Sequence, residues 1–129
     1  MSEGTRTGKV AWVAKTGAPH VAPIWFVVDG DDLVFNTHSA SGKAQALARE
    51  VRASLVVDDQ TPPYSFVKVA GTISISADTD EVRSFATRIG GRYMGADRAE
   101  EYGARNGVSG ELVVRLHPTK VTAGFDVSG

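Results

Sequence analysis

The stretch from residue 19 to residue 43, PHVAPIWFVVDGDDLVFNTHSASGK, contains the pattern that decides the fold of this 129-residue chain. Two apolar runs flank the Asp-Gly-Asp-Asp segment at 29–32, and an Asp-Gly pair in that setting is a strong signal for a β-hairpin. A polar loop follows the second run and leads into a helical pattern. We therefore expect strands over 21–28 and 33–37, and a helix over 41–52.

The rest of the chain continues this mainly β pattern. Along 66–76, apolar and polar residues alternate, which predicts a strand with one buried and one exposed face. Pro23 has no backbone N–H to donate to a neighbouring strand, so that end of its strand should lie at a sheet edge or carry a bulge. Gly90-Gly91 should end or interrupt the second helix. The further elements we expect are strands over 10–14, 54–58, 66–76, 112–116 and 121–125, and helices from 78 to about 89 and over 96–105. These elements predict a mainly β fold with short helices, an antiparallel Greek-key-type barrel formed by a single domain over 1–129.

Composition excludes several classes of function. The formal net charge is −1, and a nucleic-acid-binding domain normally shows a strong basic excess. The chain has no cysteine, which excludes disulfides, thiolate metal sites and cysteine nucleophiles. No apolar run approaches the ~20 residues of a membrane helix, and the first residues contain no apolar signal region. We expect a soluble cytoplasmic protein that binds neither nucleic acid nor membrane.

The polar loop after the second strand of the hairpin has the composition of an anion site. Thr37, Ser39 and Ser41 supply hydroxyls, His38 can donate a hydrogen bond, and the start of the helix supplies free backbone N–H groups. Lys43 falls in the first helical turn, where the helix dipole disfavours a cation. A bound anion offsets that penalty, so the loop is interpreted as a phosphate site.

An aromatic pair lies on the strand beside this loop. Successive strand residues face opposite sides, so one of Trp25 and Phe26 should be in the core and the other in a groove or a subunit seam. Neither His20 nor His38 is expected to be catalytic, and no His, Asp or Glu spacing matches a zinc site. We expect no metal site and no catalytic side chain.

The order of these motifs resembles the pyridoxamine 5′-phosphate oxidase-like split-barrel family, and within it the deazaflavin-dependent branch of actinobacteria. The resemblance covers nearly the whole chain. The matching pieces are Gly17-Ala18-Pro19-His20, Pro23-Ile24-Trp25-Phe26, Asp29-Gly30, Phe35-Asn36-Thr37, Ser41-Gly42-Lys43-Ala44, Leu47-Ala48-Arg49, Ala53-Ser54-Leu55 and Val69-Ala70-Gly71-Thr72-Ile73.

The resemblance implies a homodimer of split β-barrels with two flavin-like cofactors in grooves between the subunits. The loop from Thr37 to Lys43, with Asn36 before it, would bind the cofactor phosphate, and the strand from Pro23 to Phe26 would lie along the ring. Arg49 and Arg52 are either solvated surface residues or part of a basic groove for an oligoglutamate tail. Tyr64 would contact the cofactor of the other subunit.

The resemblance implies an oxidoreductase that uses reduced coenzyme F-420 to transfer a hydride to a conjugated small-molecule acceptor. In such an enzyme the cofactor supplies the reaction and the protein supplies binding and orientation. One alternative is an oxidase or reductase of the same fold that binds FMN. Another is a non-catalytic protein that binds haem, another tetrapyrrole or the deazaflavin itself, because a fold does not determine a function.

Overall fold

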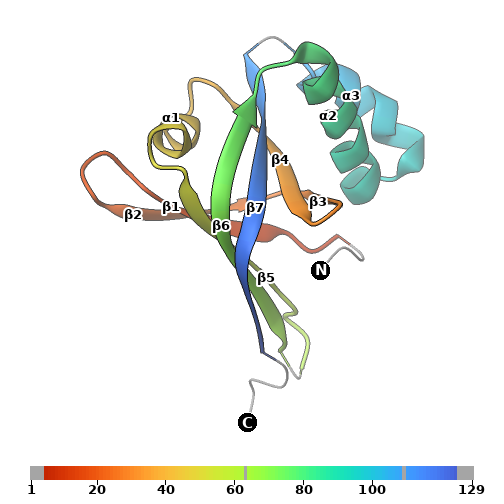
Figure 1. The fold of residues 1–129 in the computed structure, drawn as a ribbon. Coiled ribbons are helices and arrows are strands. Elements are labelled where there is room, and N and C mark those ends of the chain that lie inside the picture. The colour runs from red at the N-terminus through yellow and green to blue at the C-terminus, as the bar shows by residue number, and fades with distance from the viewer. Residues whose placement is uncertain (1–4, 63, 109, 125–129) are drawn as a thin grey trace.

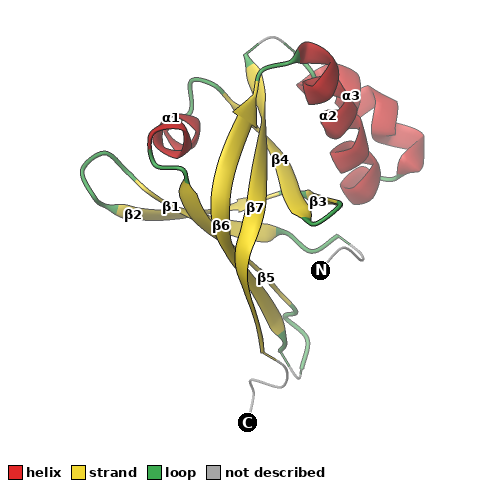
Figure 2. Ribbon diagram, in the orientation of Figure 1, coloured by secondary structure: helices red, strands yellow, loops and turns green. Residues whose placement is uncertain are grey.

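Seven strands form one antiparallel sheet in the order β2-β1-β5-β6-β7-β4-β3. The structure is a computed structural model and describes residues 5–62, 64–108 and 110–124. The strands are β1 (Gly8–Val13), β2 (Pro19–Ile24), β3 (Val27–Asp29), β4 (Asp32–His38), β5 (Arg52–Asp58), β6 (Phe66–Ser76) and β7 (Glu111–Gly124). The helices are α1 (Gly42–Arg49), α2 (Thr79–Met94), the 3-10 turn η1 (Ala96–Arg98) and α3 (Ala99–Asn106). Helix α1 lies on one side of the sheet end, and α2 and α3 lie together on the other (Figures 1 and 2).

The sheet curls around an apolar interior. Inward-facing residues of six strands form this interior together with Leu47 of α1, and Phe26, Phe35 and Leu55 are among its fully buried members. The alternation predicted for β6 is confirmed, because Val69 and Ile73 are buried while Lys68 and Thr72 are exposed. The expected mainly β, antiparallel fold is therefore confirmed.

Strand β4 is buried on both faces, and this determines where the helices pack. Leu33 and Phe35 point into the barrel, whereas Val34 contacts a second cluster formed with α2. That cluster includes Phe85 and Ile89 on the apolar face of α2. Helix α2 begins next to residue 78 as predicted, and Asp78 caps it, since its side chain accepts a hydrogen bond from the backbone N–H of Glu81 at 3.0 Å.

Three element predictions were wrong. The expected strand over 21–28 is two strands, β2 and β3, separated at Trp25 and Phe26. The expected helix over 41–52 ends at Arg49, because Arg52 already belongs to β5. The two strands expected over 112–116 and 121–125 are one, β7, and Pro118 lies where the β6–β7 register shifts opposite Gly71. A register shift is one of the few places where a sheet accepts proline.

The prediction that Gly90 and Gly91 end or interrupt the second helix was also wrong. Helix α2 runs through both glycines to Met94. Gly90 faces α3 at a place where a Cβ atom would overlap the Cβ of Tyr102. The glycine therefore permits close packing of α3 on α2.

Candidate functional site

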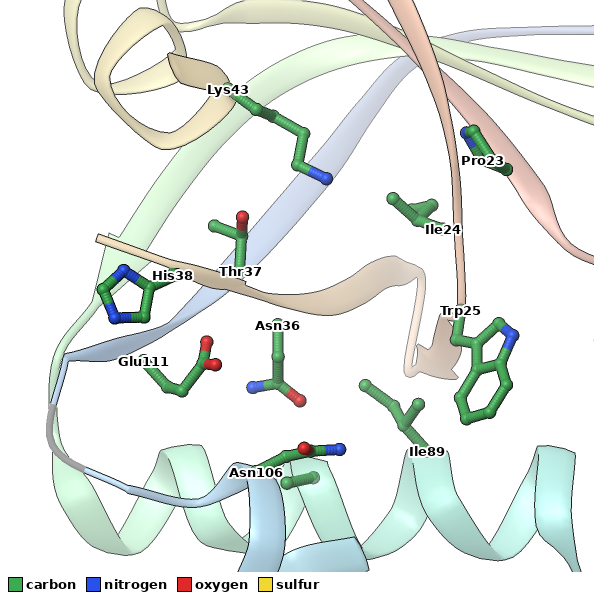
Figure 3. A pocket seen from close by; sticks show the side chains of 11 residues that line it. Pro23, Ile24, Trp25, Asn36, Thr37, His38, Lys43, Ile89, Asn106 and Glu111 are labelled. Atoms are coloured by element: carbon green, nitrogen blue, oxygen red, sulfur yellow. The ribbon is translucent and has the colours of Figure 1, made fainter. Parts of the chain in front are cut away.

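A pocket of about 320 Å³ lies where α1, β4 and the α2–α3 pair meet (Figure 3). Its walls come from the end of β2, from β4, from the first turn of α1, and from α2, α3 and the start of β7. The lining residues are Pro23, Ile24, Trp25, Asn36, Thr37, His38, Lys43, Ala86, Ile89, Asn106 and Glu111. Six of these, namely Pro23, Trp25, Asn36, Thr37, His38 and Lys43, are residues that the sequence predicts as cofactor contacts.

One end of the pocket is cationic. The side chain of Lys43 reaches from the first turn of α1 toward Thr37 and Ile24 (Figure 3). Its Nζ lies 5.8 Å from the centroid of the Phe35 ring, and burial lowers the pKa of its ammonium group. No ion-pair partner for Lys43 is found among the described residues. A bound anion would compensate both the lost hydration and the unfavourable helix dipole.

The loop before α1 is held in place by its own hydrogen bonds. The hydroxyl of Ser41 caps the helix by accepting from the N–H of Ala44 at 3.0 Å, and it also lies 3.2 Å from the hydroxyl of Thr37. The His38 ring accepts from the N–H of Ala40 through Nδ1 at 3.1 Å. Ser39 pairs through its backbone N–H with the carbonyl of Gly110 at 2.7 Å, and its side chain does not line the pocket. The loop therefore presents Thr37 and Lys43 in fixed positions.

The opposite end of the pocket is aromatic. Trp25 stacks on Tyr93 of α2, with ring centroids 4.9 Å apart and planes 7° apart. The backbone between β2 and β3 makes no strand-pairing hydrogen bonds here, and side chains of α2 supply hydrogen bonds in their place. The hydroxyl of Tyr93 accepts from the N–H of Phe26 at 3.2 Å, and Arg92 donates to the carbonyl of Phe26 at 2.7 Å. This break turns Trp25 into the pocket while Phe26 enters the core.

Sequence reasoning missed the polar floor of the pocket. Asn106 is the last residue of α3, and Glu111 is the first residue of β7, where it pairs with His38. These side chains lie near that of Asn36, whose Nδ2 donates to the carbonyl of Leu112 at 3.4 Å (Figure 3). Ile24, Ala86 and Ile89 add apolar area. Only strand register and helix docking bring Asn106 and Glu111 here, and nothing local in the sequence indicates it.

The remaining predicted site residues lie elsewhere. Phe26 is fully buried in the barrel interior. Arg49 and Arg52 are exposed and do not line the pocket, and Arg52 is paired with Glu50 at 2.8 Å. Tyr64 is exposed in the β5–β6 connection, and this connection lies at the far end of β5 and β6 from α1 (Figure 1). Any role for Arg49, Arg52 or Tyr64 in binding would lie outside this pocket.

The fold and this site define a class. One antiparallel sheet curled around an apolar interior is the architecture of a split barrel, and in this chain Lys43 and Trp25 line a pocket beside it. The family model described as pyridoxamine 5′-phosphate oxidase matches residues 2–123, so the chain belongs to that family. No curated protein gives a significant sequence match to the chain.

Solved structures share the fold. A conserved hypothetical protein from Mycobacterium tuberculosis is 21% identical with a TM-score of 0.82, over 95% of this chain and 79% of that one. A protein described as an F-420 reductase is 23% identical with a TM-score of 0.74, over 94% and 92%. The heme storage protein HutZ from Vibrio cholerae is 15% identical with a TM-score of 0.73, over 95% and 89%. At these identities the similarity concerns the fold alone.

None of the helices in the described part of the chain is both long and apolar enough to cross a membrane.

Proposed function

We propose that the protein is an oxidoreductase that binds reduced coenzyme F-420 in this pocket and transfers a hydride to a small conjugated acceptor. The observation that carries the proposal is the half-buried ammonium of Lys43, which faces the pocket beside the hydroxyl of Thr37 with no ion-pair partner in the described chain. An ammonium and a hydroxyl together are suited to a phosphate group.

The residues present fit both a phosphate and a conjugated ring. Lys43 and Thr37 would hold the phosphate at one end. Trp25 and Ile89 would flank the ring at the other, where an apolar wall would exclude water from the reacting face. Bound F-420 would supply the hydride, and the side chains would orient its ring and the acceptor.

The choice of F-420 over FMN rests on two supports. The segment Pro23-Ile24-Trp25-Phe26 resembles the deazaflavin branch, and the fold matches a protein described as an F-420 reductase. Both cofactors carry a ring and a phosphate, so the pocket itself serves either one. The oligoglutamate tail of F-420 would need cations beyond the pocket. Arg49 is available for this role more readily than Arg52, which is paired with Glu50.

We further propose that the protein is a homodimer and that the second subunit helps to enclose the cofactor. The pocket volume is near the lower end of the ~300–1,000 Å³ typical of ligand sites, so a three-ring cofactor would extend beyond it. A separate concave surface of about 440 Å³, lined by Trp12, Val13 and Ala70 among others, lies over β1, β5 and β6. Val13 and Val21 on the β1–β2 hairpin are 43% and 67% exposed. A homodimer interface, which usually buries at least ~1,200 Å², would cover such a surface.

Titration of the purified protein with F-420, FMN and haem tests the cofactor assignment. The proposal expects F-420 to bind most tightly, followed by oxidation of the reduced coenzyme when a panel of conjugated acceptors is added. Tighter binding of FMN, or a haem spectrum with no deazaflavin binding, would replace it with the corresponding alternative. Light scattering tests the dimer separately, and a monomer at micromolar concentration would refute the shared groove.

A further inference from the structure

Three polar side chains outside the pocket form a connected row on the outer face of the sheet. Nε2 of His117 lies 2.8 Å from the hydroxyl oxygen of Ser74, and its Nδ1 lies 3.2 Å from a carboxylate oxygen of Asp32. The three residues come from β7, β6 and β4, which are adjacent in the sheet. Distant parts of the chain thus bring a hydroxyl, an imidazole and a carboxylate into one line.

The strand register explains why these residues meet. His117 pairs with Thr72, so Ser74 is its diagonal neighbour two residues along β6 on the same face. On the other side, Asp32 precedes Leu33, which pairs with Leu116. Asp32 is therefore next to His117 across the β4–β7 ladder. The row depends on rigid strands and not on a loop.

The hydrogen-bond chemistry sets the direction of the proton. A carboxylate only accepts, so Nδ1 of neutral His117 carries the hydrogen and donates it to Asp32. The lone pair of Nε2 then faces the hydroxyl of Ser74. Asp32 is itself held by Arg115, whose Nη1 donates to it at 3.1 Å and to Asp29 at 3.0 Å. The carboxylate thus orients the imidazole in the tautomer that can take a proton from serine.

From this geometry we propose that Ser74 is a nucleophile toward activated acyl esters, with His117 as its general base and Asp32 as the positioning residue. The Ser74 oxygen bonds to the acyl carbon while its proton passes to Nε2 of His117. The carbon–oxygen bond to the leaving alcohol breaks, and that alcohol takes the proton. Water, activated in the same way, then hydrolyses the acyl-serine and releases the carboxylic acid.

Arg115 provides a charge for the oxyanion that forms on the acyl group. It is the direct cross-strand partner of Ser74 in the β6–β7 ladder. Two of its five N–H donors, both on Nη1, are used by Asp29 and Asp32, and no other hydrogen bond from Arg115 is found among the described residues. A guanidinium next to the reacting carbon stabilises the negative charge that develops there.

This site is separate from the pocket and accessible to a reagent. Neither Ser74, His117 nor Asp32 lines the pocket. Ser74 is exposed, and the side chain of His117 is 43% exposed. Success or failure of the cofactor proposal therefore leaves the acyl-transfer proposal unaffected.

The test uses the purified full chain with two probes, p-nitrophenyl acetate and a fluorophosphonate that labels activated serines. We expect a burst of p-nitrophenol and a label located on Ser74 by mass spectrometry. Ser74→Ala should abolish both, and His117→Ala should slow labelling about a hundredfold or more, with recovery on addition of millimolar imidazole. Asp32→Asn should slow labelling, and Asp32→Glu should restore part of it. Ser84→Ala, at an exposed helix serine, is the matched control and should change nothing.

Circular dichroism confirms that each variant is folded before the rates are compared. Two results would overturn the proposal. One is a label that is absent from Ser74 or equally strong on Ser84. The other is p-nitrophenol release that persists at the same rate in Ser74→Ala, which would assign the reaction to a free imidazole.

Discussion

Removal of the Lys43 charge should weaken cofactor binding without weakening the fold. Lys43→Met keeps a long apolar stem near the Phe35 ring and removes only the ammonium group. A charge-assisted hydrogen bond to a phosphate contributes roughly 1.5–3 kcal/mol. At 1.4 kcal/mol per factor of ten, the dissociation constant for F-420 should rise about ten- to a hundredfold.

The effect on the free protein should be small or opposite in sign. In the first turn of α1 the ammonium opposes the helix dipole, at a cost of about 0.3–1 kcal/mol, and it is also partly desolvated. Its removal should therefore leave the melting temperature unchanged or slightly raised. Fluorescence titration of F-420 against wild type, Lys43→Met and Lys43→Ala measures the binding. Lys68→Ala, at an exposed lysine of β6, is the control.

A dissociation constant for Lys43→Met within twofold of wild type would refute the phosphate assignment. So would an equal loss in Lys68→Ala, since that lysine is remote from the pocket.

Other expected outcomes concern the oligoglutamate tail of F-420, the packing of α3 on α2 and the loss of stability at low pH. Binding of F-420 should weaken as salt rises, and more steeply than binding of FMN, because an anionic tail on exposed cations is screened over ~8 Å at physiological ionic strength; equal slopes for the two cofactors would contradict a bound tail. Gly90→Ala should destabilise the protein by about 1–3 kcal/mol in urea unfolding because its Cβ would overlap Tyr102, whereas Gly42→Ala, which meets no atom within 4 Å, should not. Hydrogen bonds from Arg115, and then from Arg88, lower the pKa of Asp29 in the folded protein. Ionised Asp29 therefore stabilises the fold above its unfolded pKa of about 3.9, and this stabilisation is lost as the pH falls through its lower, folded pKa. Melting temperatures from pH 5 to pH 2 should therefore fall more in wild type than in Asp29→Asn. At this half-exposed site the difference should correspond to less than about 1 kcal/mol of stability. Equal falls in the two proteins would show that the Asp29 carboxylate does not stabilise the fold.

Local patterns in the sequence predicted the elements whose causes are local. The Asp-Gly turn, the starts of the helices near residues 41 and 78 and the alternation along β6 depend on residues a few positions apart, and all are present. The break at Trp25 could not be predicted in this way. It depends on Tyr93 and Arg92, which supply the hydrogen bonds that the ladder lacks and lie 66 to 67 residues further along the chain.

The same division applies to the pocket. Thr37 and His38 end β4, and Lys43 follows a few residues later in the first turn of α1, so their proximity could be predicted from spacing. Asn106 and Glu111 reach the pocket because α3 docks on α2 and because β7 pairs with β4. Arg49 and Arg52 are close in sequence to the loop, but the end of α1 and the start of β5 carry them away from it.

The hydrogen bonds at Phe26 also set an order of assembly on the ribosome. Trp25 and Phe26 are synthesised early, yet the hydroxyl and guanidinium that hold their backbone belong to residues 92 and 93. Contacts at such long sequence separation form late, because the loop between them must close first. Under the proposed function, a nascent chain that has not yet released α2 would have Thr37 and Lys43 but would lack the Tyr93 ring on which Trp25 stacks. Such a chain would not retain the coenzyme. Loading of the proposed cofactor would then follow translation, because it would wait for the docking of a single helix.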